Sequence, residues 1–296
     1  MKVTLRQLQV FEAVSSLGSV MTAAERLGMS QSAASEALKD LQIILRRPLF
    51  THVKGRPLQL TEEGKRLRPM IRSMLHLGDE IERAPEEEMR GRLVVGATAM
   101  IAETMLPELC VGFRKRYPDV QILIQAEAQG ELFLRLQRME LDTALIEYFP
   151  DLPDVELTRW RNDELWLVVA PHHPLASRKR LRMEDLAGLS WCSRESMSSI
   201  TVRLRVLLHE DVGRLAAGIE ATSNQAVRLA AIAGGGIACL SSHMVEADVE
   251  AGRLVRLQVR GFRFTRALSL ARPKGIWRSR VAAAFDDFLL EHADPA

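Results

Sequence analysis

The sequence predicts an α/β protein that begins with a winged helix-turn-helix. Three helical patterns and a short hairpin pattern fill the first 60 residues, and one long amphipathic helix follows them. From Arg92 onward, strand-like runs such as LVVGA, QILIQAE and LWLVVA alternate with helical segments, which is typical of an α/β domain. The 296 residues exceed the roughly 150 of a typical domain. We therefore divide the chain into residues 1–60, 61–90 and 91–296.

The first two predicted helices meet at small residues. An apolar stripe with helical spacing ends at Gly18, and a second helical pattern, MTAAERLG, follows Ser19. Ala24 and Gly28 lie four residues apart, where two crossing helices need small side chains and a tight turn. The stripe consists of Leu5, Leu8, Phe11, Val14 and Leu17.

The third predicted helix has one apolar and one polar face. Ser30 is a plausible N-cap, and the apolar face of residues 31–45 is expected to pack on the first two helices. Short hydrogen-bonding side chains near a helix N-terminus suit the major groove of DNA, where Gln pairs with adenine and Ser with several base edges. The candidate DNA contacts are Thr22, Ser30, Gln31, Ser32, Ser35, Lys39, Lys54, Arg56 and Thr61.

Basic charge is concentrated in this part of the chain. The formal net charge is only +2, but residues 1–66 hold an excess of Lys and Arg over Asp and Glu. The segment PLFTHVKGRPLQLT alternates apolar and polar residues around Gly55 and Pro57, which predicts a two-stranded wing. Lys54 and Arg56 near its tip are expected to contact the DNA backbone or the minor groove.

Spacing alone leaves a plain three-helix bundle as an alternative, but four motifs in order add a resemblance. LRQLQVFEAV, GSVMTAAERLGMSQSAASEALKDL, PLF and LTEEGKRL resemble the LysR family of bacterial transcriptional regulators. Two residues depart from the family pattern: Arg46 stands where Gly is usual, and His52 stands where Arg is usual. These departures affect the expected DNA contacts and leave the class unchanged.

The resemblance implies a ligand-responsive regulator that binds promoter operators. Its implied partners are double-stranded operator DNA, RNA polymerase, and a small effector that is a carboxylate or oxyanion. It also implies a homodimer that assembles into a homotetramer. The C-terminal domain would resemble a two-lobed periplasmic solute-binding protein, with crossovers near Asp163 and Arg266. Lobe I would then comprise residues 92–162 and 267–296, and lobe II residues 163–266.

The long helix has a heptad pattern. Thr61 is a plausible N-cap, and Glu62 and Glu63 stand in the first turn, where the helix dipole favours carboxylates. The apolar repeat spans about two and a half heptads, which favours a dimer seam but leaves packing on the chain's own first helix as an alternative. Pro85 and Glu86 to Glu88 predict a hinge after it. The seam residues are Leu67, Met70, Met74, Leu77 and Ile81.

Candidate effector contacts follow predicted strands, because ligands of open α/β sheets bind at the carboxyl ends of strands. Hydroxyls before helices can hold an anion, and Arg194 could supply a countercharge. The alternative is that these serines and threonines are simply N-caps. The candidates are Thr98, Ala99, Met100, Ile101, Glu147, Arg194, Ser198, Ser199, Thr201 and Asn224.

The chain also resembles, more weakly, the branch of the family that controls sulfur metabolism and senses small oxyanions. It shares IE after the third strand and RE at Arg194. It departs from that branch at Met100 and at Met197 to Ile200, where the branch has a hydroxyl and a Gly-Ser-Gly-Thr-like stretch. A more apolar cleft of this kind suits an organic or aromatic acid equally well.

The sequence lacks the signatures of other classes of protein. The seven histidines show no H-E-x-x-H spacing, and Gly234 to Gly236 follow a helix instead of opening one, so we expect no enzyme, no cofactor and no metal. A DNA-packaging protein would not need so large an α/β domain. The three cysteines show no C-x-x-C spacing, and there is neither a secretory signal nor an apolar run of the ~20 residues that a membrane span needs, so we expect a cytoplasmic protein.

Overall fold

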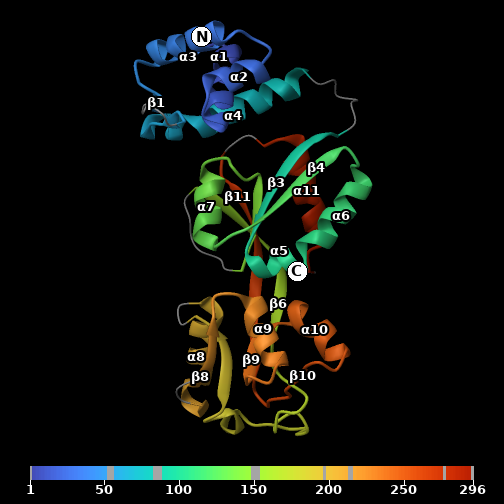
Figure 1. The fold of residues 1–296 in the computed structure, drawn as a ribbon. Helices are drawn as coiled ribbons and strands as arrows, with labels where there is room; N and C mark the ends of the chain where they lie inside the picture. The colour runs from blue at the N-terminus through green and yellow to red at the C-terminus, as the bar shows by residue number, and fades with distance from the viewer. Residues whose placement is uncertain are drawn as a thin grey trace.

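The structure, a computed structural model, describes residues 2–51, 57–82, 89–147, 154–195, 198–212, 216–275 and 278–294. Three bodies lie one after another along its long axis (Figure 1). We call the first the reading head, and the other two lobe I and lobe II. The predicted fold class, a winged helix-turn-helix followed by a two-lobed α/β domain, is confirmed.

The reading head is built from three capped helices and a small hairpin. Thr4 and Gln7 form a capping box on the first helix, and the hydroxyls of Ser19 and Ser30 cap the next two. Their apolar faces enclose a core around Phe11 and Leu41. The elements are α1 (Leu5–Leu17), α2 (Val20–Arg26), α3 (Gln31–Leu45), β1 (Phe50–Thr51) and β2 (Gln59–Leu60).

The long helix α4 (Glu62–Glu82) packs on the reading head with one face. Leu67, Ile71 and Leu75 join the core of the three helices. Gly64 is required there, because a Cβ at this position would lie 2.3 Å from the carbonyl oxygen of Leu49. The predicted hinge at Pro85 and Glu86 to Glu88 lies outside the described residues.

Lobe I is a sheet with helices on both faces. β3 pairs in parallel with β4 and β5, so their carboxyl ends lie at one edge. Figure 1 shows that this edge, marked by α5, faces lobe II. The elements are β3 (Gly91–Ala97), α5 (Ala99–Thr104), α6 (Leu106–Arg116), β4 (Val120–Ala126), α7 (Gln129–Gln137), β5 (Thr143–Ile146) and α11 (Arg280–Glu291).

Lobe II repeats this arrangement around a second parallel set. β7 pairs in parallel with β8 and β9, and the helices that follow these strands begin near lobe I. The elements are η1 (Met183–Leu186), β7 (Ser190–Arg194), α8 (Ser199–Val212), β8 (Ala216–Ala221), α9 (Asn224–Ile232), β9 (Ile237–Ser241), α10 (Ser242–Glu250) and β10 (Val255–Arg256).

Two long antiparallel strands connect the lobes. β6 (Val155–Val169) and β11 (Thr265–Pro273) pair with each other in lobe I, and β6 then pairs with β9 in lobe II. The strand order is β4-β3-β5-β11-β6-β9-β7-β8, with β10 beside β6. Asp163 and Arg266, the expected crossover residues, are register partners at this passage.

Within the described ranges, no helix is long and apolar enough to cross a membrane.

Candidate DNA-binding face and interlobe site

The outer face of α3 is polar and exposed to solvent. Ala34, Leu38 and Leu41 are buried against α1 and α2, which turns the opposite side of the helix to solvent. Among the described residues, the side chains of Gln31, Ser35 and Lys39 make no hydrogen bond or ion pair. The expected contact face on α3 is therefore both exposed and available. Thr22, Ser30, Gln31, Ser32, Ser35 and Lys39 are all exposed.

The hydroxyl of Thr61 is already hydrogen-bonded within the protein. It donates to the carbonyl of Pro48 (2.8 Å) and accepts from the backbone N–H of Gly64 (3.0 Å), so it caps α4. The paired strands β1 and β2 form the base of the expected wing. Lys54 and Arg56 at its tip lie outside the described residues.

A buried charged cluster occupies the passage between the lobes. The guanidinium of Arg266 donates from Nε to Asp163 (2.7 Å), and its Nη1 lies 2.9 Å from Oε2 of Glu147. Asp163 also accepts a hydrogen bond from the Ser241 hydroxyl (2.6 Å), which brings β9 of lobe II into the cluster. Only 3% of the Arg266 side chain is exposed. Because an unpaired buried charge is costly, this cluster fixes the geometry of the crossover strands.

Several buried polar atoms beside this cluster have no partner. The backbone N–H of Thr98 donates to Leu145 (3.1 Å), and Ser269 is the register partner of Ile146, so Thr98, Glu147 and Ser269 lie at adjoining strand positions. The large majority of buried polar atoms in proteins have a hydrogen-bond partner, so several unpaired atoms in one place mark a candidate ligand site. Within the described chain, the unpaired atoms beside the cluster include Thr98 Oγ1, Glu147 Oε1, Arg266 Nη2 and Ser269 Oγ.

Arg194 has its own countercharge in lobe II. Its Nε and Nη2 each donate to Glu195 (2.7 Å), and Nη1 donates to Oδ1 of Asn224 (3.1 Å). The hydrogen bond from Arg194 lowers the pKa of Glu195 below its ordinary value. In this arrangement the adjacent carboxylate neutralises Arg194, so the prediction that Arg194 offers its charge to an effector requires the effector to compete with Glu195.

The neighbouring hydroxyls divide into two groups. The Thr201 hydroxyl is buried within α8 and donates to the carbonyl of Arg194 (3.1 Å), so it is paired inside lobe II and does not act as an N-cap. Ser198 is half-buried and Ser199 is exposed at the start of α8. Asn224 is buried at the start of α9, where Ser223 is the N-cap.

Met100 and Ile101 were expected to line the effector cleft, but the structure buries both side chains. Both are buried, at 1% and 0% exposure, in an apolar core that continues from α5 into Met244 and Val245 of α10. They join the lobes instead of lining an open cleft, because α5 turns its apolar face toward lobe II. Ala99, one residue earlier, is exposed. Met197 lies outside the described residues.

Sequence reasoning gave no binding role to Arg266, Asp163, Ser241 or Ser269. The sequence offered one signal for the first two: Asp163 and Arg266 are opposite charges on the two expected crossover strands, and buried strands carry few charges. The side-chain contact itself depends on the register of β6 against β11, which pairs residues 103 positions apart in sequence.

The cysteines carry no sign of reactivity. All three are buried and free, and burial raises the pKa of Cys110 and Cys239 to about 12. Their thiols stay protonated at neutral pH and are poor nucleophiles. Across the described ranges, no cluster of His, Cys, Asp and Glu could hold a metal ion.

Two family models match successive parts of this chain. Residues 5–65 match the bacterial regulatory helix-turn-helix protein model of the lysR family, and residues 86–294 match the LysR substrate binding domain. The RuBisCO operon transcriptional regulator of Allochromatium vinosum is 30% identical, covering 99% of this chain and 97% of its own. The uncharacterized HTH-type transcriptional regulator YeiE of Escherichia coli K12 is 31% identical, over 100% and 99% of the two chains.

The fold comparison agrees over the full length. A full-length OxyR variant from Pseudomonas aeruginosa superimposes with a TM-score of 0.74 at 19% identity, covering 98% of this chain and 94% of that one. These relatives are regulators and not enzymes. The chain belongs to the LysR family of transcriptional regulators.

Proposed function

We propose that the protein binds operator DNA as an oligomer and changes its DNA contacts when a small anionic metabolite binds between the lobes. The observation that carries this proposal is the group of unpaired polar atoms where the strand ends of lobe I meet the crossover strands. In this proposal, residues 1–60 read DNA, 61–90 pair the chains and 91–296 sense the effector. The protein would act in the cytoplasm, where promoter DNA and RNA polymerase are found.

DNA recognition is assigned to the exposed face of α3. Gln31 lies at the N-terminus of the helix with its amide unpaired, where it can contact an adenine edge. Replacing Gln31 with Ala should cost about 1 to 3 kcal/mol on the operator and far less on random DNA. Lys39→Ala is the matched control, because losing a phosphate contact weakens both DNAs alike. Fluorescence anisotropy at one fixed salt concentration measures both, and unchanged operator affinity for Gln31→Ala would refute the assignment.

The effector is proposed to carry both an anionic group and a hydrogen-bond donor. Arg266 Nη2 and the hydroxyls of Thr98 and Ser269 can donate to a carboxylate or oxyanion, and Glu147 Oε1 can accept from a hydroxyl or ammonium of the same molecule. Among solved relatives of similar fold, one regulatory domain is a complex with 2-PG and another with shikimate. Small hydroxy acids are therefore the first compounds to screen.

Two hydroxyl deletions test this site without removing a charge. Thr98→Val and Ser269→Ala should each weaken effector binding about tenfold, the equivalent of one net hydrogen bond. Neither should destabilise the free protein, because each removes a buried hydroxyl that has no protein partner. The control is Thr201→Val, which removes a paired hydroxyl and should lower stability instead. Calorimetric affinities equal to wild type in both variants would place the effector elsewhere.

Oligomer formation is assigned to the free face of α4 and to the sensor domains. Met70, Met74, Leu77 and Ile81 are exposed apolar residues at a/d spacing, which supports a seam between two chains. Leu67 belongs instead to the core of the reading head. Val111 on α6 and Leu229 on α9 are also exposed, and they offer lobe surfaces through which dimers can join into a tetramer.

A further inference from the structure

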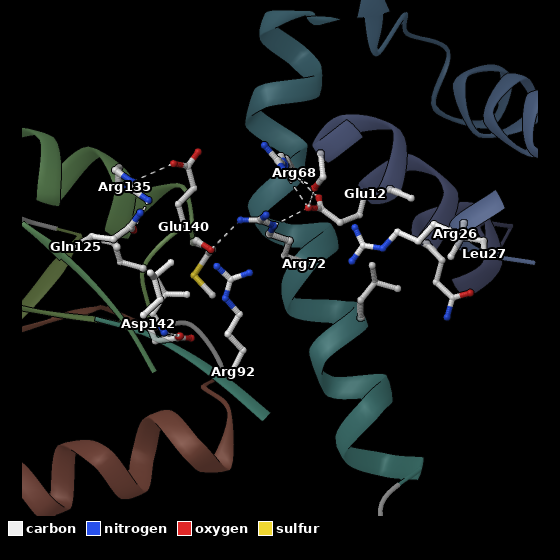
Figure 2. Close-up of a pocket in the computed structure, with 18 residues that line it drawn as sticks. Glu12, Arg26, Leu27, Arg68, Arg72, Arg92, Gln125, Arg135, Glu140 and Asp142 are labelled. Atoms are coloured by element: carbon white, nitrogen blue, oxygen red, sulfur yellow. Dashed lines mark hydrogen bonds and ion pairs between the residues drawn. The ribbon is translucent and has the colours of Figure 1, made fainter. Parts of the chain in front are cut away.

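A groove separates the reading head from lobe I. Its volume is about 730 Å³, and its walls come from α1, α2 and α4 on one side and from β3, β4, α7 and the turn after α7 on the other. Figure 2 shows the labelled side chains of both walls on either side of this space. The groove is distinct from the interlobe passage, which lies at the opposite end of lobe I (Figure 1).

Arginine dominates the charges of this groove. Five arginines line it against three carboxylates, so cationic groups are in excess. The arginines are Arg26, Arg68, Arg72, Arg92 and Arg135, and the carboxylates belong to Glu12, Glu140 and Asp142.

Three of these arginines already have partners. Arg68 and Arg72 share the carboxylate of Glu12, with N–O distances of 3.0 and 2.8 Å. Arg135 is paired with Glu127 and Glu140. Each of these ion pairs lies within one wall of the groove. Their charges are therefore neutralised inside that wall and stabilise it.

Arg26 and Arg92 are different. Neither makes a hydrogen bond or ion pair with any described residue, and both are exposed. Arg26 lies at the end of α2 in the reading head, and Arg92 lies at the start of β3 in lobe I. Figure 2 shows both guanidinium groups directed toward the middle of the groove. Each wall thus presents one free cation to the same space.

We infer that this groove is a second ligand site, which takes a compact metabolite carrying two anionic groups, such as a dicarboxylate or a phosphorylated acid. Guanidinium groups bind carboxylates and phosphates through paired N–H donors, and a dianion can satisfy one arginine on each wall. A groove of about 730 Å³ is within the usual range of small-molecule pockets.

Such a ligand would control the placement of the reading head. It contacts both walls only when the reading head lies against lobe I, so it stabilises that arrangement over any in which the two separate. The hydrogen bond that crosses the groove from Arg72 Nη1 to the carbonyl of Met139 is long, at 3.4 Å, and holds the two walls together only weakly. Binding in the groove and binding to DNA are then reciprocally coupled, since both depend on where the recognition helices lie.

Titration of the full-length protein tests the inference. The probes are 3-phosphoglycerate and succinate, with inorganic phosphate as a third arm that separates a free phosphate from an organic dianion. We expect saturable binding of 3-phosphoglycerate or succinate, weakened at least tenfold in the Arg26→Gln/Arg92→Gln double variant. Because neither arginine has a structural partner among the described residues, this variant should fold normally. Arg114→Gln, an exposed arginine on α6 outside the groove, is the matched control and should bind as wild type does.

Two further measurements locate the site. Hydrogen exchange with bound probe should slow in residues 24–28 and 138–142, one segment from each wall. In a Thr98→Val background, the Arg26→Gln/Arg92→Gln substitutions should still weaken probe binding at least tenfold. This comparison tests the groove alone, so its result stands even if the proposed interlobe effector site is wrong. The inference is overturned if neither organic probe binds saturably, if the double variant binds as tightly as wild type, or if Thr98→Val alone abolishes binding.

Discussion

Arg46 shows how a single residue departs from what its position favours. It caps α3 with φ 53° and ψ 36°, the left-handed conformation that glycine adopts without strain. In the LysR family glycine is usual here, so the sequence departure coincides with a strained backbone. The Arg46 side chain is exposed and makes no hydrogen bond or ion pair with the described residues that would offset this strain.

Replacing Arg46 with Gly should therefore stabilise the reading head. The left-handed conformation costs a residue with a Cβ about 1 to 2 kcal/mol, and the greater freedom of glycine in the unfolded chain offsets part of this gain. We expect a net increase of about 1 kcal/mol in the free energy of unfolding, measured by urea denaturation. Arg46→Ala keeps the Cβ and should show no gain. Equal stability of the Gly and Ala variants would contradict the strain.

The helix α4 uses its two faces for different purposes. Its inner face joins the reading head through Leu67, Ile71 and Leu75, which agrees with the alternative of packing on the chain's own helices. Its outer face leaves Met70 and Ile81 exposed at 60% and 76%. The heptad pattern thus contained both an internal contact and a free apolar stripe, and the proposed dimer seam belongs to the stripe alone.

Placing Asp at Met74 and Leu77 tests the seam. Two carboxylates buried in an interface without partners should split the dimer and remove operator binding with it. Sedimentation velocity and operator titration on the same samples measure both effects. Lys65→Asp, on an exposed part of the same helix, controls for added negative charge. An unchanged sedimentation coefficient in the double variant would show that the exposed apolar stripe of α4 does not form the dimer interface.

At the scale of the whole molecule, Glu12 joins separate parts of the chain. Its carboxylate on α1 accepts from Arg68 and Arg72 on α4, and Arg72 reaches lobe I through Met139. Burial raises the pKa of Glu12, but the hydrogen bond from Arg68 and the charges of Arg72 and Arg68 outweigh it, and the pKa lies below its usual value. Glu12 is therefore ionised in the folded protein at neutral pH.

This pKa predicts a loss of stability in acid. Because the folded-state pKa is lower than that of the unfolded chain, the contribution of Glu12 is fully present above the ordinary value of 4.5 and is lost as pH falls through the lowered value. Glu12→Gln should cost about 2 kcal/mol at pH 7, as expected for a hydrogen bond to a charged group. It should also reduce the slope of stability against pH below 4.5, measured by urea denaturation. The same slope in both proteins would show that Glu12 titrates alike in the folded and unfolded chain.

Local sequence determined the elements of this protein and its family. Helix spacing, capping hydroxyls and strand alternation are properties of neighbouring residues, so the helix-turn-helix, the start of α4 near Thr61 and the α/β alternation could be predicted from them. The polar face of α3 followed from the same periodicity, because knowing which side is apolar also fixes the side that faces solvent.

Only the tertiary structure decided which of the candidate side chains are free. Arg194 was expected to supply its charge to a ligand, but its orientation toward Glu195 and Asn224 depends on how β7 meets α9. Met100 was expected in a cleft, but the packing of α5 against α10 places it in a core. Asp163 pairs with Arg266 because two strands distant in sequence share a register, and Arg26 and Arg92 line one groove because the reading head lies beside lobe I. Pairing and burial depend on contacts between distant residues, and local periodicity carries no information about those contacts.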